Sequence, residues 1–418
     1  MSQRVVVTGL GVVSPVGNDI DTFWNSLING VSGISELTAF DDSDYTCKIA
    51  GEVGEIDFTN YVETKEAKRT DRCILFSLVA ADQAIRDANL DLASVDLNRC
   101  ATIIGSGIGG LAFLENEHTK LVKRGPGRVS PFLIPMMISD MSAGRVSIKY
   151  GLKGINYAVV SACASGAHAI GDSYEYIKNG IMDMAVTGGT EAAITPLAYA
   201  GFCNMKAVST RNKIPQKASS PFDKKRDGFV MGEGAGIVVL ESLEHAQKRG
   251  APIYGEIIGY GASGDAYHIA APCVDGEGAR RSMLMALERS GLAPGDIDYI
   301  NAHGTATPDG DIAETIAIKA AFGKDAFSVA ISSTKSMTGH LLGASGGIEF
   351  IASIKALCHG IIPPTINLDD ADPECDLNYT PHTAVEKQLN YVLSNSFGFG
   401  GHNASLIAGK YEDSHSSV

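Results

Sequence analysis

The sequence lacks four features, and each absence argues against a class of protein. No uninterrupted apolar run approaches the roughly 20 residues that cross a bilayer, and the N-terminus lacks the charged-then-apolar order of a signal peptide. The 8 cysteines form no CxxC pair and follow no regular spacing, which argues against structural zinc and a disulfide framework. Basic residues are outnumbered, with 34 Lys and Arg against 48 Asp and Glu, so nucleic acid is disfavoured as the main partner, although a local basic patch is compatible with this balance. We therefore expect a cytoplasmic protein that binds neither nucleic acid nor membrane.

What the sequence does contain is a globular composition, with 44% apolar and 20% charged residues among 418. Short β-branched runs alternate with stretches in which apolar residues recur at the helical period. Strands are expected at 4–7, 101–104, 156–161, 184–187, 297–302 and 329–332, and helices at 70–89, after Cys163 to about 178, at 311–322 and at 341–359. The alternation restarts after Gly250, which predicts an α/β fold of mainly parallel sheets in two halves, 1–250 and 251–418. The polar, turn-rich stretch 209–228 is expected to be a long loop.

Two glycine-rich motifs are weak signals. Gly105-x-Gly107-x-x-Gly110 fits the dinucleotide-binding fingerprint, but a lone match is not specific. The stretch 343–347 fits the hydrolase pattern G-x-S-x-G, but that elbow must follow a strand directly, and the preceding residues predict a loop. We interpret both motifs as small residues that allow close packing.

A cysteine and two histidines stand at the ends of expected elements. Cys163 lies where a helix begins, so free backbone N–H groups and the helix dipole are expected to stabilise its thiolate. His303 ends a strand and His340 precedes a helix, which are places where α/β folds bind ligands. Each alone is structural about as often as functional, but the three together favour nucleophilic catalysis. Metal binding by His303, Asp309 and Asp311 has no recognised ligand spacing.

The three residues belong to longer motifs. These are Ser161-Ala162-Cys163-Ala164-Ser165-Gly166, His303-Gly304-Thr305-Ala306-Thr307-Pro308 and Ser333-Thr334-Lys335-Ser336-Met337-Thr338-Gly339-His340. In this order they resemble the elongating, type II β-ketoacyl-acyl carrier protein synthases, and the resemblance extends from 5–11 to 395–401. It implies a thiolase-like α/β fold, with two similar βαβ-rich halves in a five-layer α-β-α-β-α arrangement, and a homodimer.

The resemblance also implies an activity in fatty acid biosynthesis. Cys163 would take an acyl chain as a thioester, and malonyl-acyl carrier protein would then lose CO2. His303 and His340, both neutral and donating from Nε2, would stabilise the resulting enolate. Backbone N–H groups of Cys163 and Phe399 would form the oxyanion hole for its attack on the acyl thioester. This decarboxylative Claisen condensation yields a 3-oxoacyl chain two carbons longer.

Further roles follow from the same resemblance. Lys335 would organise the site, with Asp311 and Glu314 as its ion partners and Glu349 as buried support. Phe399 would act as a gate in a glycine-rich loop. A structural cation occupies matching positions in some relatives, which correspond to Asn301, Glu349, Ser394 and Asn395.

Substrate contacts can be carried over in the same way. Thr305 and Thr307 resemble hydroxyls that hold the phosphopantetheine of acyl carrier protein, and Ile108 and Phe202 match acyl-pocket positions. No cofactor is implied, because the substrates arrive on the carrier. The expected docking residues for the acidic carrier protein are basic: Lys65, Lys68, Arg69, Lys206 and Arg211.

Three other functions remain open. A polyketide-type ketosynthase of a specialised pathway would share Cys163, His303 and His340. A thiolase needs a second cysteine near the C-terminus, and none follows Cys375. A non-catalytic carrier-protein binder is disfavoured because Cys163 is intact. The sequence also departs from the type II pattern, with Ala164 for the usual Thr, Lys206 for a common Arg and His402 for a frequent Thr, which leaves chain-length preference and carrier affinity open.

Overall fold

The protein, described here over residues 2–412 by a computed structural model, is built on a ten-stranded mixed sheet in the order β10-β9-β13-β14-β8-β1-β7-β6-β4-β5. The first half of the chain supplies β1 (Val5–Val13), β4 (Cys100–Gly105), β5 (Asn156–Tyr157), β6 (Met184–Glu191) and β7 (Gly234–Ser242). The second half supplies β8 (Gly255–Gly264), β9 (Tyr299–Asn301), β10 (Ala330–Ser332), β13 (Tyr391–Gly398) and β14 (His402–Gly409). Two small sheets pair β2 (Ser35–Glu36) with β3 (Ile49–Ala50) and β11 (Ile361–Ile362) with β12 (Val385–Glu386).

The two halves repeat one topology. If the five strands of each half are numbered along the chain, both halves have the order third, second, fourth, fifth, first. In each half the fifth strand is antiparallel to its two neighbours, and the other two pairings are parallel. The halves join where β1 pairs antiparallel with β8. The expectation of mainly parallel sheets was therefore wrong for the fifth strands. The short turn between β13 and β14 permits only an antiparallel hairpin.

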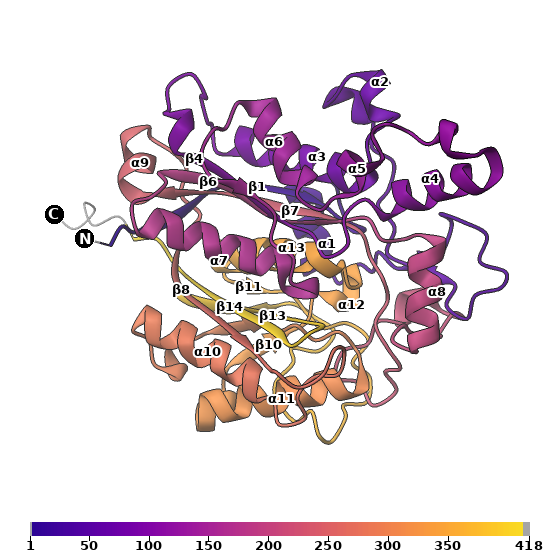
Figure 1. Cartoon of the computed structure of the whole chain (residues 1–418). Helices are drawn as coiled ribbons and strands as arrows, with labels where there is room; N and C mark the ends of the chain where they lie inside the picture. Colours follow the sequence, from indigo (N-terminus) through magenta and orange to yellow (C-terminus); the bar gives the residue numbers. More distant parts are fainter. Residues whose placement is uncertain (1, 413–418) are drawn as a thin grey trace.

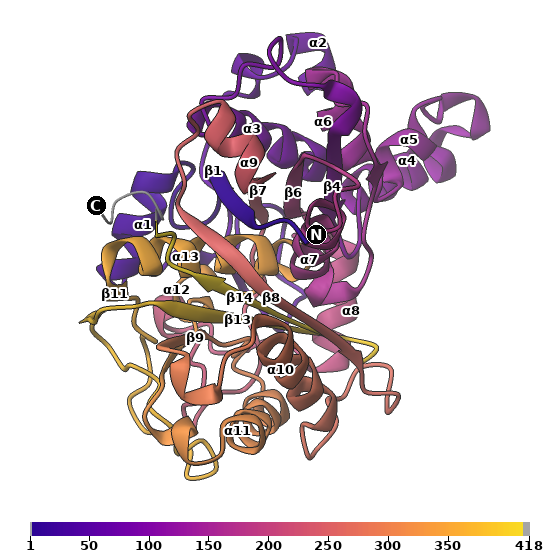
Figure 2. The same ribbon diagram turned by 90° about the vertical axis from the view of Figure 1, so that its left-hand side faces the viewer.

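The helices complete five layers, as expected (Figure 1). The longer ones are α3 (Arg72–Asp87) and α6 (Met141–Tyr150) on the first outer face, α7 (Ser165–Lys178) and α13 (Ser345–His359) between the two halves of the sheet, and α10 (Glu277–Ser290) and α11 (Pro308–Phe322) on the second outer face. The remaining helices are α1 (Ile20–Ile28), α2 (Thr64–Ala67), α4 (Leu111–Arg124), α5 (Leu133–Met137), α8 (Pro196–Met205), α9 (Leu243–Lys248) and α12 (Lys335–Thr338). Figure 2 shows α4 and α5 projecting from the body of the first half.

Close packing explains the glycine motifs. A Cβ on Gly9 of β1 would lie 2.1 Å from the carbonyl oxygen of Ala84 in α3. A Cβ on Gly105 at the end of β4 would lie 2.3 Å from the carbonyl oxygen of Ser165 at the start of α7. Glycine at these positions lets each helix lie directly on its strand.

Two expected elements are shorter than the sequence pattern indicates. The strand expected at 156–161 is regular only at Asn156–Tyr157, although the carbonyl of Val159 still accepts from the Ser106 amide. The helix expected from Leu341 begins at Ser345, because Leu341 to Ala344 form a tight turn with a left-handed Leu342 (φ +49°). Segment 209–228 is a loop with one short 3-10 helix, as expected. Over residues 2–412, no helix is both long and apolar enough to cross a membrane.

Candidate active site

Cys163 lies at the entrance to α7, in a 3-10 turn formed by Ala162–Ala164. Ala162 adopts a left-handed conformation (φ +50°), which turns the chain sharply before the helix. The Ser165 hydroxyl fixes this turn, since it accepts from the Ser161 amide and donates to the Ala162 carbonyl. The Cys163 side chain is buried, and the backbone N–H of Phe399 points to its sulfur.

The second half of the chain brings two histidines to this sulfur. His340 Nε2 lies 3.0 Å from Cys163 Sγ, and its Nδ1 lies 2.9 Å from Ser345 Oγ at the start of α13. The His303 and His340 rings are nearly perpendicular, with centroids 5.3 Å apart. The structure thus places together the three residues that the sequence singled out.

Lys335 is the buried cation of the site. Its Nζ donates to the His303 carbonyl (2.6 Å), lies 3.4 Å from His303 Nδ1 and pairs with Glu349 at 2.5 Å. An ammonium can only donate, so Nδ1 of His303 must accept and the ring proton must be on Nε2. The expected Nε2–H tautomer of His303 follows from this contact.

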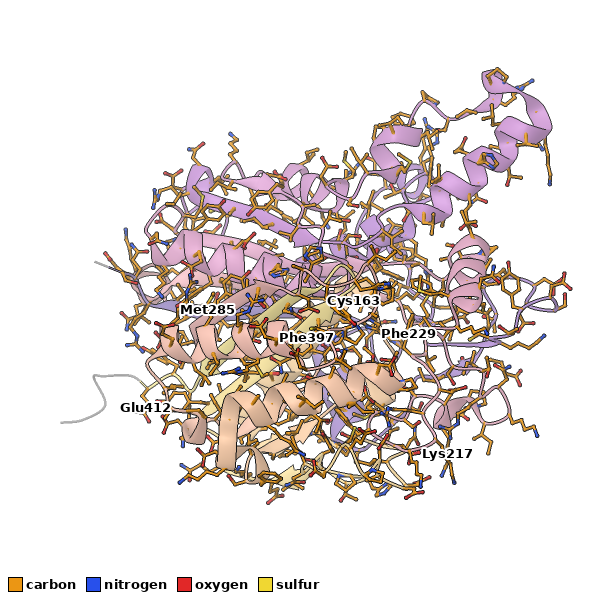
Figure 3. The ribbon with its side chains drawn as sticks, turned by 60° about the horizontal axis from the view of Figure 1, so that its bottom comes forward. Cys163, Lys217, Phe229, Met285, Phe397 and Glu412 are labelled. Atoms are coloured by element: carbon orange, nitrogen blue, oxygen red, sulfur yellow. The ribbon has the colours of Figure 1, made fainter. Side chains whose placement is uncertain are left out.

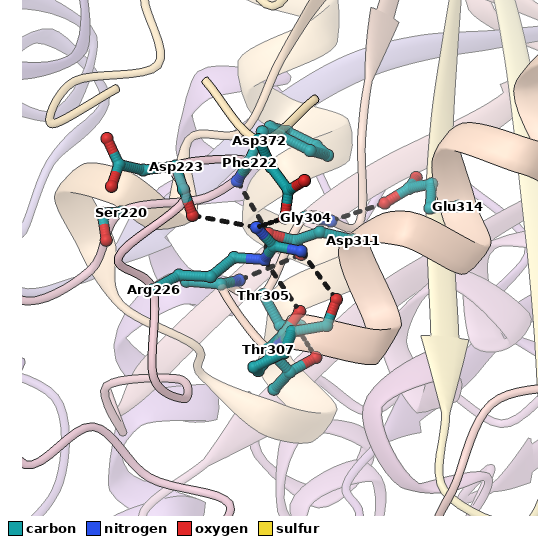
Figure 4. Close-up of polar contacts among 12 residues, drawn as sticks. Ser220, Phe222, Asp223, Arg226, Gly304, Thr305, Thr307, Asp311, Glu314 and Asp372 are labelled. Carbon is teal, nitrogen blue, oxygen red and sulfur yellow. Dashed lines mark hydrogen bonds and ion pairs between the residues drawn. The ribbon is translucent and has the colours of Figure 1, made fainter. Parts of the chain in front are cut away.

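The turn that carries His303 is held from α11 (Figure 4). The Glu314 carboxylate accepts from the amides of His303 (2.8 Å) and Gly304 (2.7 Å). The Asp311 carboxylate accepts from the amides of Ala306 and Phe222. The expectation that Asp311 pairs with Lys335 was wrong: its ion partner is Arg226, at 3.3 Å, whereas Lys335 pairs with Glu349. Glu314 is likewise engaged with backbone amides rather than with Lys335, although the Lys335 charge lowers its pKa, which burial raises.

Arg226 locks the far side of the same turn. Its guanidinium donates to the carbonyls of Thr307 and Pro308 and to Asp372 (Figure 4). The hydroxyls of Thr305 and Thr307 lie 3.0 Å apart on this turn. Arg226 belongs to no sequence motif, because it lies in the loop 209–228, and only the folded chain brings it to Asp311 of α11.

Burial dominates the electrostatics. It raises the pKa of the Cys163 thiol to about 12, against the opposing effects of Lys335 and the Phe399 amide. The expected stabilisation of the thiolate by the helix start is therefore outweighed by desolvation. Burial and the Lys335 charge hold the pKa values of His303 and His340 well below the usual range, so both rings are neutral. Burial raises the pKa of Glu349 to about 7 despite Lys335.

A cavity of about 580 Å³ opens onto these residues. In Figure 3, Cys163, Phe397 and Phe229 are labelled in the interior around it. Thr305 and Thr307 lead from His303 toward the exposed Asp309. The lining of the cavity includes the residues expected at the acyl pocket, the pantetheine contacts and the gate: Ile108, Phe202, Thr305, Thr307 and Phe399. The nucleophile Cys163 therefore faces a mostly apolar cavity.

The family models for the N-terminal and C-terminal domains of β-ketoacyl synthase match residues 2–246 and 254–369. The chain belongs to the β-ketoacyl synthase family. Its relatives include 3-oxoacyl-[acyl-carrier-protein] synthase 2 of Synechocystis sp., 53% identical over 98% of this chain and 99% of the relative. The enzyme of the same name from Staphylococcus aureus is 50% identical over 98% of this chain and 99% of its own length.

Solved structures agree with this assignment. A β-ketoacyl synthase from Burkholderia phymatum matches with a TM-score of 0.91 and 34% identity, covering 98% of this chain and 100% of its own. A type II polyketide synthase acyl-carrier protein in complex with its ketosynthase, bound to the hexaketide, matches with a TM-score of 0.92 and 35% identity, covering 98% and 100%. These neighbours confirm the thiolase-like ketosynthase fold.

The basic residues expected to dock a carrier protein lie in two places on this β-ketoacyl synthase. Lys206 is exposed at the end of α8 and lines the cavity, whereas Arg211 donates to Ser220 Oγ at 2.7 Å. Lys65, Lys68 and Arg69 are exposed on and after α2, and none of them lines the cavity.

The expected cation site can be tested on its buried polar atoms. Asn301 Oδ1 and Glu349 Oε2 are buried acceptor oxygens without a hydrogen-bond partner among the described residues, whereas Glu349 Oε1 lies 2.5 Å from Lys335 Nζ. Asn301 Oδ1 and Glu349 Oε2 fit a cation. The Asn395 side chain does not, because it bonds Ser405 and contacts Glu314. No cluster of three or more His, Cys, Asp or Glu suited to a metal occurs in residues 2–412, so His303, Asp309 and Asp311 form none.

Proposed function

We propose that this protein catalyses the decarboxylative Claisen condensation of malonyl-acyl carrier protein with an acyl-enzyme thioester, in fatty acid biosynthesis. The observation that supports this function most directly is the contact of Cys163 Sγ with His340 Nε2 at 3.0 Å. Both residues line the same mostly apolar cavity as the neutral His303. The names of the relatives at 50–53% identity support the same activity.

In the first half-reaction, Cys163 attacks the thioester of acyl-acyl carrier protein. A thiol with a pKa near 12 carries little thiolate at neutral pH, so the sulfur must lose its proton as it attacks. His340 Nε2 is the acceptor within hydrogen-bond distance. The proton is then transferred to the sulfur of the departing pantetheine. The reaction thus converts acyl-acyl carrier protein and the Cys163 thiol into acyl-Cys163 and the free thiol of the carrier protein.

In the second half-reaction, malonyl-acyl carrier protein loses CO2 and its thioester oxygen gains negative charge. In the acyl-enzyme the single ring proton of neutral His340 moves to Nε2, and Nδ1 accepts from the Ser345 hydroxyl 2.9 Å away. Nε2–H donors of His303 and His340 then stabilise this enolate, and its carbon attacks the acyl-Cys163 carbonyl. The amides of Cys163 and Phe399 receive the oxyanion. The bond to Cys163 then breaks, the sulfur takes up one proton from solvent water, and the 3-oxoacyl-acyl carrier protein leaves two carbons longer.

The proposed partners follow from the access route. The pantetheine arm of acyl carrier protein enters past Thr307 and Thr305, with Lys206 at the mouth; Arg211, Lys65, Lys68 and Arg69 are candidates for contacts farther out. The polyketide neighbour solved with its acyl-carrier protein supports this mode. No step transfers electrons, so the proposed chemistry calls for no redox cofactor.

We also propose that the protein is a cytoplasmic homodimer and that Asn301 and Glu349 bind a structural cation. Among residues 2–412, no further strand lies beside the edge strand β5, and Val160 just after it is 58% exposed. Phe132 and Ile134 are exposed near α5, which projects from the same half (Figure 2). A second copy would cover these apolar side chains.

A polyketide-type ketosynthase is the second candidate, because the solved ketosynthase of a type II polyketide synthase shares the fold at 35% identity. The higher identity of the relatives named 3-oxoacyl-acyl carrier protein synthase 2 favours fatty acid elongation. A thiolase is disfavoured, since Cys375 is buried in the core of the second half and does not line the cavity.

The test is acylation of Cys163 followed by mass spectrometry with acyl-acyl carrier proteins of graded length. The wild type should carry one acyl adduct on Cys163. Cys163→Ala should lose the adduct and condensation but retain malonyl decarboxylation, and His303→Ala should lose decarboxylation. Cys203→Ala is the matched control, because this half-buried thiol lies beside Phe202 outside the cavity lining. Elongation by Cys163→Ala, or an adduct on another cysteine, would refute the proposal.

A further inference from the structure

Glu191 is a fully buried carboxylate without a basic partner in residues 2–412, at the end of β6. Five donors converge on it. Oε2 accepts from the amides of Gly107 (2.7 Å) and Gly343 (3.1 Å). Oε1 accepts from Ser106 Oγ (2.9 Å) and from the amides of Ile108 (3.2 Å) and Gly109 (3.3 Å). Burial raises the pKa of this carboxyl and these hydrogen bonds oppose the rise.

The donors belong to the two glycine-rich motifs that no step of the proposed reaction uses. Gly107 to Gly109 are in the turn after β4, and Gly343 is in the turn before α13. The two turns touch: a Cβ on Gly343 would lie 2.5 Å from the Gly107 nitrogen and 2.7 Å from Glu191 Oε2. One carboxylate therefore joins a turn from each half of the chain.

Both turns also supply the wall of the cavity. Ile108 lines it from the first turn and Leu342 from the second. Leu342 is left-handed (φ +49°), a conformation that persists in a non-glycine residue only when its surroundings hold it. The bond from the Gly343 amide to Glu191 fixes the peptide that follows Leu342. The Ile108 amide is bonded to the same carboxylate.

We propose that Glu191 is a positioning residue that holds Ile108 and Leu342 as a rigid wall and thereby sets discrimination between acyl chain lengths. The inference rests on the proposed function for its substrate. Glycine gives the turn at 105–110 wide backbone freedom, so the carboxylate is what selects one conformation. An amide in its place offers one acceptor oxygen and turns an NH2 donor toward backbone N–H groups, which releases the turn.

The test compares wild type with Glu191→Gln in two measurements. Hydrogen exchange of the Gly107, Ile108, Gly109 and Gly343 amides needs no substrate, and we expect these amides to exchange at least about tenfold faster in the variant, since each loses a charged acceptor. Acylation of Cys163 by a series of acyl-acyl carrier proteins should show a flatter length profile, with the ratio of best to worst substrate falling at least about threefold, because a mobile wall discriminates less.

Two variants separate positioning from general destabilisation. Glu233→Gln is the matched control: Glu233 is also buried and accepts from Arg72 and the Val53 amide, but neither of these partners lines the cavity. It should leave the length profile unchanged. Ser106→Ala removes one of the five donors and should change the exchange rates and the length profile in the same direction as Glu191→Gln, but more weakly. It takes the place of Glu191→Gln in the test if that variant does not fold.

The outcomes are distinguishable. Unchanged protection of the four amides in Glu191→Gln, or a rate loss equal for all chain lengths, would overturn the role of Glu191. Absence of any acyl adduct on wild-type Cys163 would instead overturn the proposed function, while the exchange measurement would still decide whether Glu191 holds the two turns.

Discussion

Replacement of Lys335 by Met tests the electrostatic core of the site. The side chain is 1% exposed and its partner Glu349 is fully buried, so the substitution leaves a buried carboxylate without its cation. Removal of one partner of such a pair costs about 3–5 kcal/mol of folding free energy. Methionine fills a similar volume, which keeps a packing defect out of the comparison.

The loss should depend on pH in a defined direction. The pKa of Glu349 is raised from 4.5 to about 7 with Lys335 in place, and removal of the positive charge raises it further. The folded variant then binds more protons than the unfolded chain above pH 4.5. Its stability therefore falls as pH rises from 4.5 through 7, until the folded pKa is passed. Below pH 4.5 this contribution of Glu349 disappears, because the carboxyl is protonated in both states.

Catalysis should suffer separately from stability. Without Nζ at 3.4 Å from Nδ1, His303 is free to protonate Nδ1 and lose the Nε2–H donor. Loss of one donor to a developing oxyanion lowers rates about 10²–10³-fold, and we expect this loss in malonyl decarboxylation.

The assay is urea unfolding between pH 4.5 and 8 together with decarboxylation of malonyl-acyl carrier protein. The double variant Lys335→Met with Glu349→Gln should recover most of the stability and lose the added pH dependence, yet remain as inactive as the single variant. A single variant as stable as wild type at pH 8 would refute the ion-pair argument. Recovery of decarboxylation in the double variant would refute the role of Lys335 in holding the His303 tautomer.

Two further predictions rest on other buried charges. In Arg226→Lys, the shorter ammonium cannot donate to the Thr307 and Pro308 carbonyls together, which displaces Thr305 and Thr307. The KM for malonyl-acyl carrier protein should therefore rise about tenfold. The control Lys225→Gln changes an exposed side chain and should leave this KM unchanged, and equal KM values for the two variants in steady-state kinetics would contradict the prediction. Burial opposes ionisation of Glu241, but hydrogen bonds from Arg249, His245 and Thr8 outweigh it and lower the pKa of this carboxyl from 4.5 to about 2. The folding stability that ionised Glu241 contributes is therefore present above pH 4.5 and is lost as pH falls toward 2. Glu241→Gln should flatten urea-derived stability over that window, and an unchanged acid slope would count against it.

Much of the site could be predicted because its signals are local. Cys163 precedes α7, His303 follows β9 and His340 lies between α12 and α13, and the motif around each is contiguous. The helix at 70–89 was close to the observed Arg72–Asp87, since Asp71 caps it and its apolar residues keep the helical period. The repeated topology of the two halves then brings such termini together.

What the sequence could not show depends on contacts between distant segments. The ion partner of Lys335 was assigned to α11, which is near His303 in sequence, but α13 supplies it through Glu349. Asp311 meets Arg226, 85 residues earlier in the chain, across a loop that has no periodicity. Glu191 carries no motif of its own, and its role is visible only once its five donors are placed.

The reactivity of Cys163 shows why a helix start alone is a poor guide to chemistry. The dipole of a helix contributes on the order of 1 kcal/mol near its terminus, whereas full burial shifts a pKa by up to several units, each worth about 1.4 kcal/mol. Burial wins, and the resting sulfur is a thiol. The same burial keeps His340 neutral and therefore able to accept a proton at Nε2, 3.0 Å from that thiol. A dry site thus replaces a preformed thiolate by a proton transfer that occurs only when an acyl group is present to be attacked.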